Sequence, residues 1–362
     1  MPSYARKEIV CDSEVEVFHA YTRCVRRAFL CGVDAVTGND YEHRKQWIEE
    51  RLQELCASMA LDVCGFAVMA NHLHVVARTR PDLAAGWSDE EVARRWWRLF
   101  PKRRDANGRA AEPEEQELQM LIADEQALAE RRRRLSSLSW FMRCLCEPIA
   151  RRANKEDGVS GRFFEGRFKC QKLLDEAAIL ACSVYVDLNP VRAGMAETPE
   201  AAPHTSAFER IQGQQEDCGP APKARSQSKS APRSAAKPRT PPRGGWLCPV
   251  DVNGDPVAVA RANAHRRASN KGFLSMSLAD YLQILDWTGR QVRGDKRGAI
   301  PGDLAPILER IGMSRENWLE TVSNFGRLFH RAAGHVSLLV EEAVRAGKRW
   351  FQGHGHCQQA FA

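Results

Sequence analysis

The first part of the chain alternates between apolar spacing that is typical of strands and apolar spacing that is typical of helices. The period-two pattern of EVEVFHAYTRCV predicts a strand over residues 14–25, because successive strand side chains point to opposite faces. LDVCGFAVMANHLHVVART predicts two strands joined by a turn near Ala70 and Asn71. Between them, EHRKQWIEERLQELCASMA has the three- and four-residue spacing of a helix over residues 42–60.

Three further elements follow in this region. SSLSWFMRCLCEPIARRAN predicts an amphipathic helix capped by Ser136 or Ser137, and GRFFEGRFKCQKLL predicts a turn that enters a strand. DEAAILACSVYVDLNPVRAGM predicts a helix that starts at Asp175 and Glu176 and finishes at Pro190. The order strand, helix, strand, strand, helix, strand, helix indicates an α+β fold, an antiparallel sheet with helices on one face.

Two segments interrupt the pattern. A charged stretch over about residues 81–132 is helical or irregular and is interpreted as an insertion. Residues 212–245 are rich in Pro, Ser, Ala, Gly, Lys and Arg and lack aromatic residues, so they predict a disordered linker. It separates a first domain, residues 1–211, from a mostly helical C-terminal domain, residues 246–362.

The formal net charge is +7, and its location is informative. Residues 218–245 hold seven Lys or Arg and no Asp or Glu, so this stretch equals the whole excess. It favours a polyanionic partner, and a solvated linker that happens to be basic is an equal alternative. No apolar run approaches the roughly 18 residues of a membrane span. The charged N-terminus does not resemble a signal peptide, so we expect a cytoplasmic protein without a membrane partner. Twelve cysteines without a C-x-x-C pair favour core residues or inert thiols over a zinc site.

His72 and His74 are one residue apart in a predicted strand, so both imidazoles point to one face and Leu73 points to the other. Two neutral imidazoles can hold a divalent metal, although a site also needs a third ligand. A core or surface role is the alternative. The same spacing at His354 and His356 lies in a glycine-rich tail with no strand to orient the rings, and we treat it as incidental.

Tyr185 and Asn189 are four positions apart in the last predicted helix of the first domain, so both project from one face. A core tyrosine whose hydroxyl finds a partner is the alternative. Because Pro190 disfavours helical geometry at the residue before it, the helix can end at Asn189 itself.

Three blocks in this order, MANHLHVV, GRFFEGRFKCQKLL and YVDLNPVRAGM, resemble the signature blocks of the REP-associated tyrosine transposases, within the HUH single-tyrosine transposase superfamily. The resemblance covers roughly residues 10–210 and implies the ferredoxin-like fold of that superfamily. It implies that Tyr185 is the nucleophile, that His72, His74 and Asn189 bind Mg²⁺ or Mn²⁺, and that the ligand is single-stranded DNA, commonly imperfect palindromes folded as hairpins. LADYLQILDWTGRQVRGDKRGAIP also resembles an extension that a subset of these proteins carries.

The chemistry that the resemblance implies is strand cleavage and transfer. Attack by the tyrosine on a phosphate releases a 3′-hydroxyl and leaves a 5′-phosphotyrosine, which a second 3′-hydroxyl reseals without ATP. The metal polarises the phosphate. The family resemblance implies a DNA transposase or endonuclease that works in the cytoplasm, at the nucleoid, as a monomer or a homodimer.

A strand needs a cationic groove with aromatic stacking surfaces. The candidates for this groove are Arg131, Arg132, Arg133, Arg134, Arg162, Phe163, Phe164, Arg167 and Lys169, with Arg151 and Arg152. The phenylalanines are equally suited to a core, and some of the arginines to a solvated helix face. Two other functions stay open: a catalytically silent, domesticated protein that binds hairpins, and a chain whose functional module is the C-terminal region.

Overall fold

The protein is described by a computed structural model. The described residues are 9–25, 30–34, 37–106, 108–217, 243–254, 266–292 and 305–361. Most of the segment that composition predicts as a linker, residues 218–242, lies outside them.

A five-stranded sheet in the order β2-β3-β1-β4-β5 forms the centre of the molecule. Its strands are β1 (Val17–Arg23), β2 (Leu61–Val68), β3 (His72–Thr79), β4 (Lys169–Leu173) and β5 (Ala332–Ala333). The first four pair antiparallel, and β5 joins β4 in parallel. The predicted antiparallel sheet is confirmed, and the hairpin turn lies at residues 69–71, as predicted.

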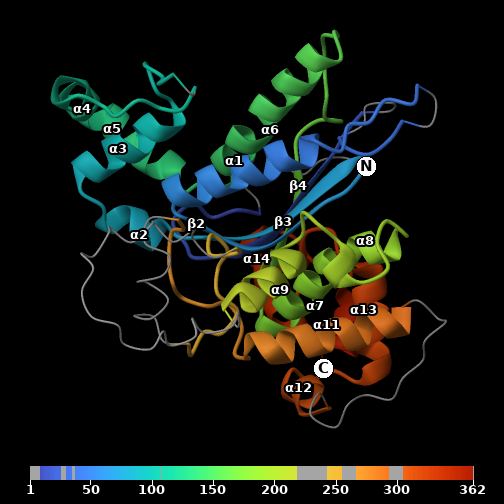
Figure 1. Ribbon diagram of the computed structural model, residues 1–362. Coiled ribbons are helices and arrows are strands. Elements are labelled where there is room, and N and C mark those ends of the chain that lie inside the picture. Colours follow the sequence, from blue (N-terminus) through green and yellow to red (C-terminus); the bar gives the residue numbers. More distant parts are fainter. Residues whose placement is uncertain are drawn as a thin grey trace, which may run out of the picture.

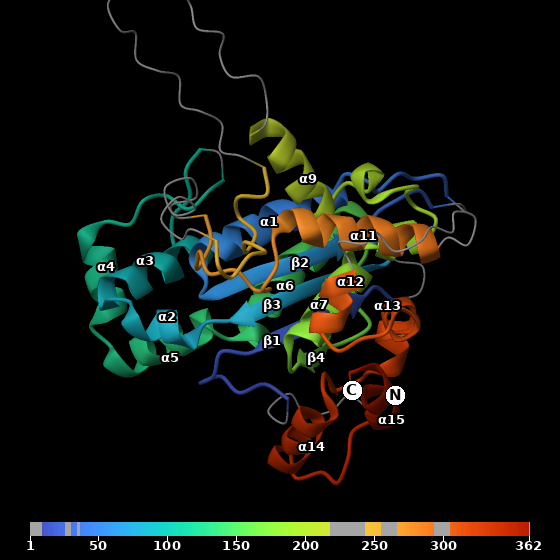
Figure 2. The same cartoon turned by 90° about the horizontal axis from the view of Figure 1, so that it is seen from below.

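Helices cover both faces of this sheet (Figure 1). One face carries α1 (Arg44–Ser58) and α6 (Leu138–Glu156), and we call it the α1 face. The other carries α7 (Glu176–Asp187) with helices of the C-terminal region, and we call it the α7 face (Figure 2).

The predicted α+β class is confirmed, whereas the prediction of helices on one face is wrong. The strands explain why. On β3, Leu73 and Val75 are buried against the α1 face, and Val76 is buried against the α7 face. A strand that is apolar on both sides needs cover on both sides.

The charged insertion folds as four helices beside α1, which agrees with the helical alternative of the sequence prediction. They are α2 (Pro81–Gly86), α3 (Asp89–Leu99), α4 (Glu115–Ile122) and α5 (Glu125–Leu135). Arginines hold them together. Arg132 donates to the carbonyls of Ala84 and Trp87 and pairs with Asp89.

The C-terminal region is mostly helical, as predicted, and packs on the α7 face. Its described helices are α11 (Leu278–Val292), α12 (Ala305–Arg310), α13 (Arg315–Leu328), α14 (Val336–Arg345) and α15 (His354–Ala360). Before them, the first domain ends with α8 (Asn189–Arg192), the 3-10 helix η2 (Pro199–Ala201) and α9 (Ser206–Asp217). Tyr281, Trp318 and Phe325 share one buried cluster with Leu180 and Val184 of α7. Residues from both predicted domains therefore build the core beneath the α7 face.

None of the described helices is both long and apolar enough to cross a membrane. The eleven described cysteines are all free thiols, nine of them buried.

Candidate functional site

Strand β3 opens with the two histidines of the H-x-H pattern, and both rings lie on the α7 face. Their ring centres are 4.9 Å apart. The Nδ1 of His72 is 2.7 Å from the amide oxygen of Asn71 in the turn before the strand. Because that oxygen only accepts, Nδ1 carries the hydrogen and Nε2 of His72 keeps a lone pair.

Helix α7 brings Tyr185 and Asn189 to the same place. Asp175 caps the helix by accepting the N–H of Ala178 at 2.8 Å, and the helix ends at Asp187, so Asn189 opens α8. The helix thus ends three residues before Pro190, where the sequence predicts its end, and Pro190 lies inside the short helix α8. The Asn189 amide nitrogen lies 3.1 Å from Nε2 of His74, and the Tyr185 ring centre lies 5.8 Å from that of His74. The structure therefore brings all four predicted side chains together.

The Tyr185 phenol is partly buried and has a cation beside it. Burial raises its pKa above the usual 10, and the guanidinium of Arg192 opposes that rise. The Arg192 guanidinium carbon lies 5.2 Å from the ring centre, and its N–H groups also donate to the carbonyl of Ser323 on α13. The phenol is thus protonated at neutral pH and needs positive charge at its oxygen to act as a nucleophile.

Helix α13 approaches this phenol so closely that a side chain at position 326 would crowd it. A methyl group on Gly326 would lie 2.9 Å from the Tyr185 hydroxyl oxygen. The C-terminal region is therefore part of the wall around the candidate nucleophile.

Two buried polar side chains that the sequence analysis did not single out complete the site. The Nε2 of His19 lies 2.8 Å from Nδ1 of His74, and its Nδ1 lies 2.9 Å from the amide oxygen of Gln171. The Gln171 amide nitrogen donates to the carbonyl of Phe329. In the alternating VFHAYTR pattern, His19 shares a face with Tyr21, but the sequence does not reveal that β1 lies between β3 and β4.

Two cavities flank Tyr185 and His74. The Tyr185 cavity has a volume of about 580 Å³. The α13 cavity, of about 340 Å³, lies toward α13. The Tyr185 cavity is lined by Tyr21, Thr22, Arg23, His72, His74, Glu165, Gly166, Arg167, Lys169 and Tyr185. The α13 cavity is lined by His19, Tyr21, His74, Tyr185, Arg192, Ser323, Asn324, Gly326 and Arg327.

The predicted nucleic-acid contacts fall into two groups. Arg167 and Lys169 line the Tyr185 cavity, and Arg162 is exposed nearby in sequence. Phe163 is a core residue, 3% exposed, which leaves no face for a base to stack on, and Phe164 packs partly buried against the same core.

The other group lies on α5, in the insertion, and is not part of either cavity beside Tyr185. Arg131, Arg132, Arg133 and Arg134 each bind carbonyls or carboxylates of the protein itself. Arg132, Arg133 and Arg134 also form ion pairs with carboxylates of the protein.

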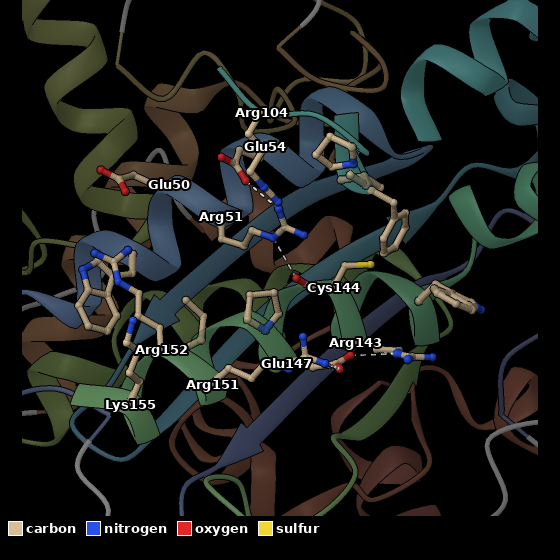
Figure 3. Close-up of a pocket in the computed structure, with 17 residues that line it drawn as sticks. Glu50, Arg51, Glu54, Arg104, Arg143, Cys144, Glu147, Arg151, Arg152 and Lys155 are labelled. Atoms are coloured by element: carbon tan, nitrogen blue, oxygen red, sulfur yellow. Dashed lines mark hydrogen bonds and ion pairs between the residues drawn. The ribbon is translucent and has the colours of Figure 1, made fainter. Parts of the chain in front are cut away.

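A third cavity, of about 920 Å³, lies in the α1–α6 layer and is larger than either (Figure 3). We call it the α1–α6 cavity. It contains Arg151 and Arg152 among six cationic side chains, together with Glu50, Glu54 and Glu147. Glu147 pairs with Arg143 and Arg151, and Arg51 donates to Glu54 and to the carbonyl of Cys144.

The donor set of the site fits a divalent metal. Burial lowers the pKa of His72 to about 4 and that of His74 well below 6.5, so both rings are neutral at pH 7, the form that ligates metals. No cluster of three His, Cys, Asp or Glu side chains suited to a metal occurs in the part of the chain that the structure describes. Asn189 is a donor of another type beside His74. A half-turn of the Asn189 amide would present its oxygen to the metal.

No protein-family model matches this sequence. Nor does any curated protein. A solved structure of a REP-associated tyrosine transposase bound to a REP hairpin is similar to 59% of this chain and 87% of its own, with a TM-score of 0.32 and 12% sequence identity. The likeness is distant and by itself assigns no function.

Proposed function

We propose that this protein is a metal-dependent transposase or endonuclease that cleaves and rejoins single-stranded DNA at hairpin ends through a 5′-phosphotyrosine. One observation carries the proposal: a phenol, two neutral imidazoles and an amide from β3, α7 and α8 converge beside a cationic cavity. The three sequence blocks support the same reaction and the palindromic ligand.

Cleavage exchanges one phosphoester for another. The bond from the Tyr185 oxygen to phosphorus forms, and the bond from phosphorus to the 3′ oxygen breaks. One proton leaves the phenol and one joins the departing 3′ oxygen. Because the phosphotyrosine keeps the energy of the phosphodiester, a second 3′-hydroxyl can reverse the step onto a new strand without ATP.

Positive charge must offset the raised pKa of the nucleophile. Arg192 supplies part of it, because its guanidinium already lies against the Tyr185 ring. A divalent metal held by His72, His74 and Asn189 would polarise the scissile phosphate and offset the charge that grows on its oxygens. We infer Mg²⁺ or Mn²⁺, which suit a phosphate substrate.

The two cavities beside Tyr185 suggest the path of the strand. On one side, no hydrogen bond or ion pair joins the side-chain charges of Arg23, Arg167 and Lys169 to another described residue, so these charges are available to phosphates. On the other side, α13 offers Arg327, which is exposed and likewise has no such partner among the described residues. A strand that passes Tyr185 would thus meet cations before and after the scissile bond.

A trapping assay tests the proposal. The protein is incubated with an end-labelled hairpin that carries a single-stranded tail, with Mn²⁺ or with a chelator, and covalent adducts are resolved on a denaturing gel. We expect an adduct that needs both Mn²⁺ and Tyr185. Tyr185→Phe should abolish it and leave hairpin affinity within about twofold.

Tyr41→Phe is the matched control, because Tyr41 stacks under Arg44 near the start of α1 and does not line either cavity beside Tyr185. Adducts that persist in Tyr185→Phe would refute the nucleophile. Tight binding with no adduct in the unchanged protein would favour the silent hairpin-binding protein.

A further inference from the structure

A chain of three hydrogen bonds connects the candidate metal ligand His74 to the main chain of the C-terminal region. We propose that His19 and Gln171 are positioning residues that hold His74 in the tautomer whose Nε2 lone pair faces Asn189. The inference rests on the proposed function, because it gives these two residues a role at the proposed metal site.

The direction of the chain is fixed at its far end. The carbonyl of Phe329 can only accept, so the side of the Gln171 amide that faces it must be the nitrogen. The amide oxygen then faces Nδ1 of His19 at 2.9 Å, and that oxygen can only accept as well. Nδ1 of His19 therefore carries a hydrogen.

The next bond holds a single proton between two ring nitrogens, Nε2 of His19 and Nδ1 of His74, which are 2.8 Å apart. Both rings are almost fully buried, with exposed fractions of 1% and 4%. Among the described residues, no acidic group acts on either ring, so a charged imidazole would be uncompensated there. His19 is then neutral with its hydrogen on Nδ1, and its Nε2 accepts from Nδ1 of His74.

His74 is left with one hydrogen, on Nδ1, and a bare Nε2. The Asn189 amide nitrogen, 3.1 Å away, donates to that lone pair, which agrees with this assignment. The opposite tautomer would point an N–H at the site and could not ligate a metal. Imidazole does not choose strongly between the two by itself, so the protein must make the choice.

Histidines that bind metals usually donate their second N–H to a carboxylate or carbonyl, and losing that partner typically costs 10–100-fold in metal affinity. Here the neutral imidazole of His19 accepts this N–H, and the amide of Gln171 orients His19. The main-chain end of the chain is held firmly. The main-chain N–H of Lys172 donates to the carbonyl of Arg331 at 2.7 Å, and that of Leu174 donates to the carbonyl of Ala333 at 2.9 Å. These two bonds fix the segment beside Phe329.

The test uses the full chain labelled with ¹⁵N at histidine and free of metal. Long-range ¹H–¹⁵N correlation spectra report which ring nitrogen carries the hydrogen, and a His74→Gln variant assigns the signal. We expect the Nδ1–H form of His74 in the unchanged protein. His19→Phe and Gln171→Leu should each shift His74 toward the other tautomer.

The second measurement is Mn²⁺ affinity, from the electron paramagnetic resonance signal of free Mn²⁺. We expect His19→Phe and Gln171→Leu to weaken binding about 10–100-fold. His19→Gln should recover part of the loss, because its amide oxygen can accept from His74. His356→Phe is the matched control: that ring bonds to Thr321 and packs against Phe329, yet does not contact His74.

The outcomes separate the inference from the proposed function. An Nε2–H form of His74 in the unchanged protein, or unchanged Mn²⁺ affinity in folded His19→Phe and Gln171→Leu, overturns the inference. If the unchanged protein binds no Mn²⁺ at His72 and His74, the proposed metal site fails. The tautomer spectra still decide whether the hydrogen bonds through His19 and Gln171 orient His74. Thermal melting curves identify any variant that is unfolded.

Discussion

The α1–α6 cavity and the Tyr185 cavity lie in different layers of one molecule and use their cations differently. The α1–α6 cavity is larger and has six cationic side chains to three in the other. Its arginines are engaged by neighbours: Arg143 and Arg151 share Glu147, and Arg152 stacks over Trp47 at 3.7 Å. The cations of the Tyr185 cavity have no ion pairs among the described residues, and the one ring contact there, Lys169 over Tyr21, is longer at 5.8 Å. A count of arginines would thus favour the α1–α6 cavity as the nucleic-acid site, whereas their partners favour the Tyr185 cavity that we propose.

The largest expected effect on hairpin affinity comes from the removal of the three cations of the Tyr185 cavity. We expect Arg23→Ala, Arg167→Ala and Lys169→Ala together to raise the Kd for a single-stranded hairpin tail roughly 100-fold, at about 1 kcal/mol for each lost contact. The salt dependence of log K should flatten by about 2, because each phosphate contact to a single strand contributes about 0.7. Fluorescence anisotropy over a range of salt concentrations measures both quantities.

The matched triple variant in the α1–α6 cavity combines Arg143→Ala, Arg151→Ala and Arg152→Ala. It removes the same formal charge, and we expect it to change Kd by less than about threefold. An equal or greater loss in this variant would reverse the comparison and make the α1–α6 cavity the nucleic-acid surface.

A smaller effect should follow from adding one methyl group to the wall of the Tyr185 cavity. Gly326→Ala would place a carbon 2.9 Å from the Tyr185 hydroxyl oxygen. The hydroxyl end of the Tyr185 side chain can move away from this carbon. We expect adduct formation to slow about 10-fold, because a displacement of this size misaligns the nucleophile. Hairpin affinity should hold. Single-turnover gel assays give the rate.

Gly355→Ala on α15 is the control, since a methyl group there has no atom within 4 Å. Both glycines are helical, so both substitutions should gain similar helix propensity. Equal adduct rates in the two variants would show that α13 does not confine the phenol.

The smallest effect concerns an arginine that the sequence analysis counted among nucleic-acid contacts. Arg132→Ala removes donors to the carbonyls of Ala84 and Trp87 and should lower the free energy of unfolding by about 1 kcal/mol, with hairpin Kd unchanged. Urea denaturation and anisotropy report the two quantities. A higher Kd with unaltered stability would return Arg132 to the binding surface.

The parts of the site that local periodicity governs were predictable. Alternation along β3 placed His72 and His74 on one face, and the four-residue spacing brought Tyr185 near Asn189, although α7 ends between them. These relations need no more than a few consecutive residues. The metal, the nucleophilic role and the DNA ligand came from the family resemblance and remain predictions.

The parts that depend on strand order were not predictable. His19 and Gln171 face each other across β1 and β4, 152 positions apart, and each stands in a strand that has other polar residues, so neither is distinguished by its local sequence. The sequence pattern does not predict the second covered face, because it does not show that the two apolar sides of β3 pack against different helix layers. The position of α13 depends on the short parallel pairing of β4 with β5, the strand that follows α13. The two alanines of β5 give no sequence signal for this pairing.

In the proposed arrangement, the anchor of His74 at Phe329 is the last part of the site to be synthesised. During synthesis, both motif histidines and the tyrosine leave the ribosome long before residue 329 does. A nascent chain thus displays every motif side chain while the anchor that orients His74 is still untranslated. Under this proposal, full affinity for metal would therefore arise only after residue 329 has emerged.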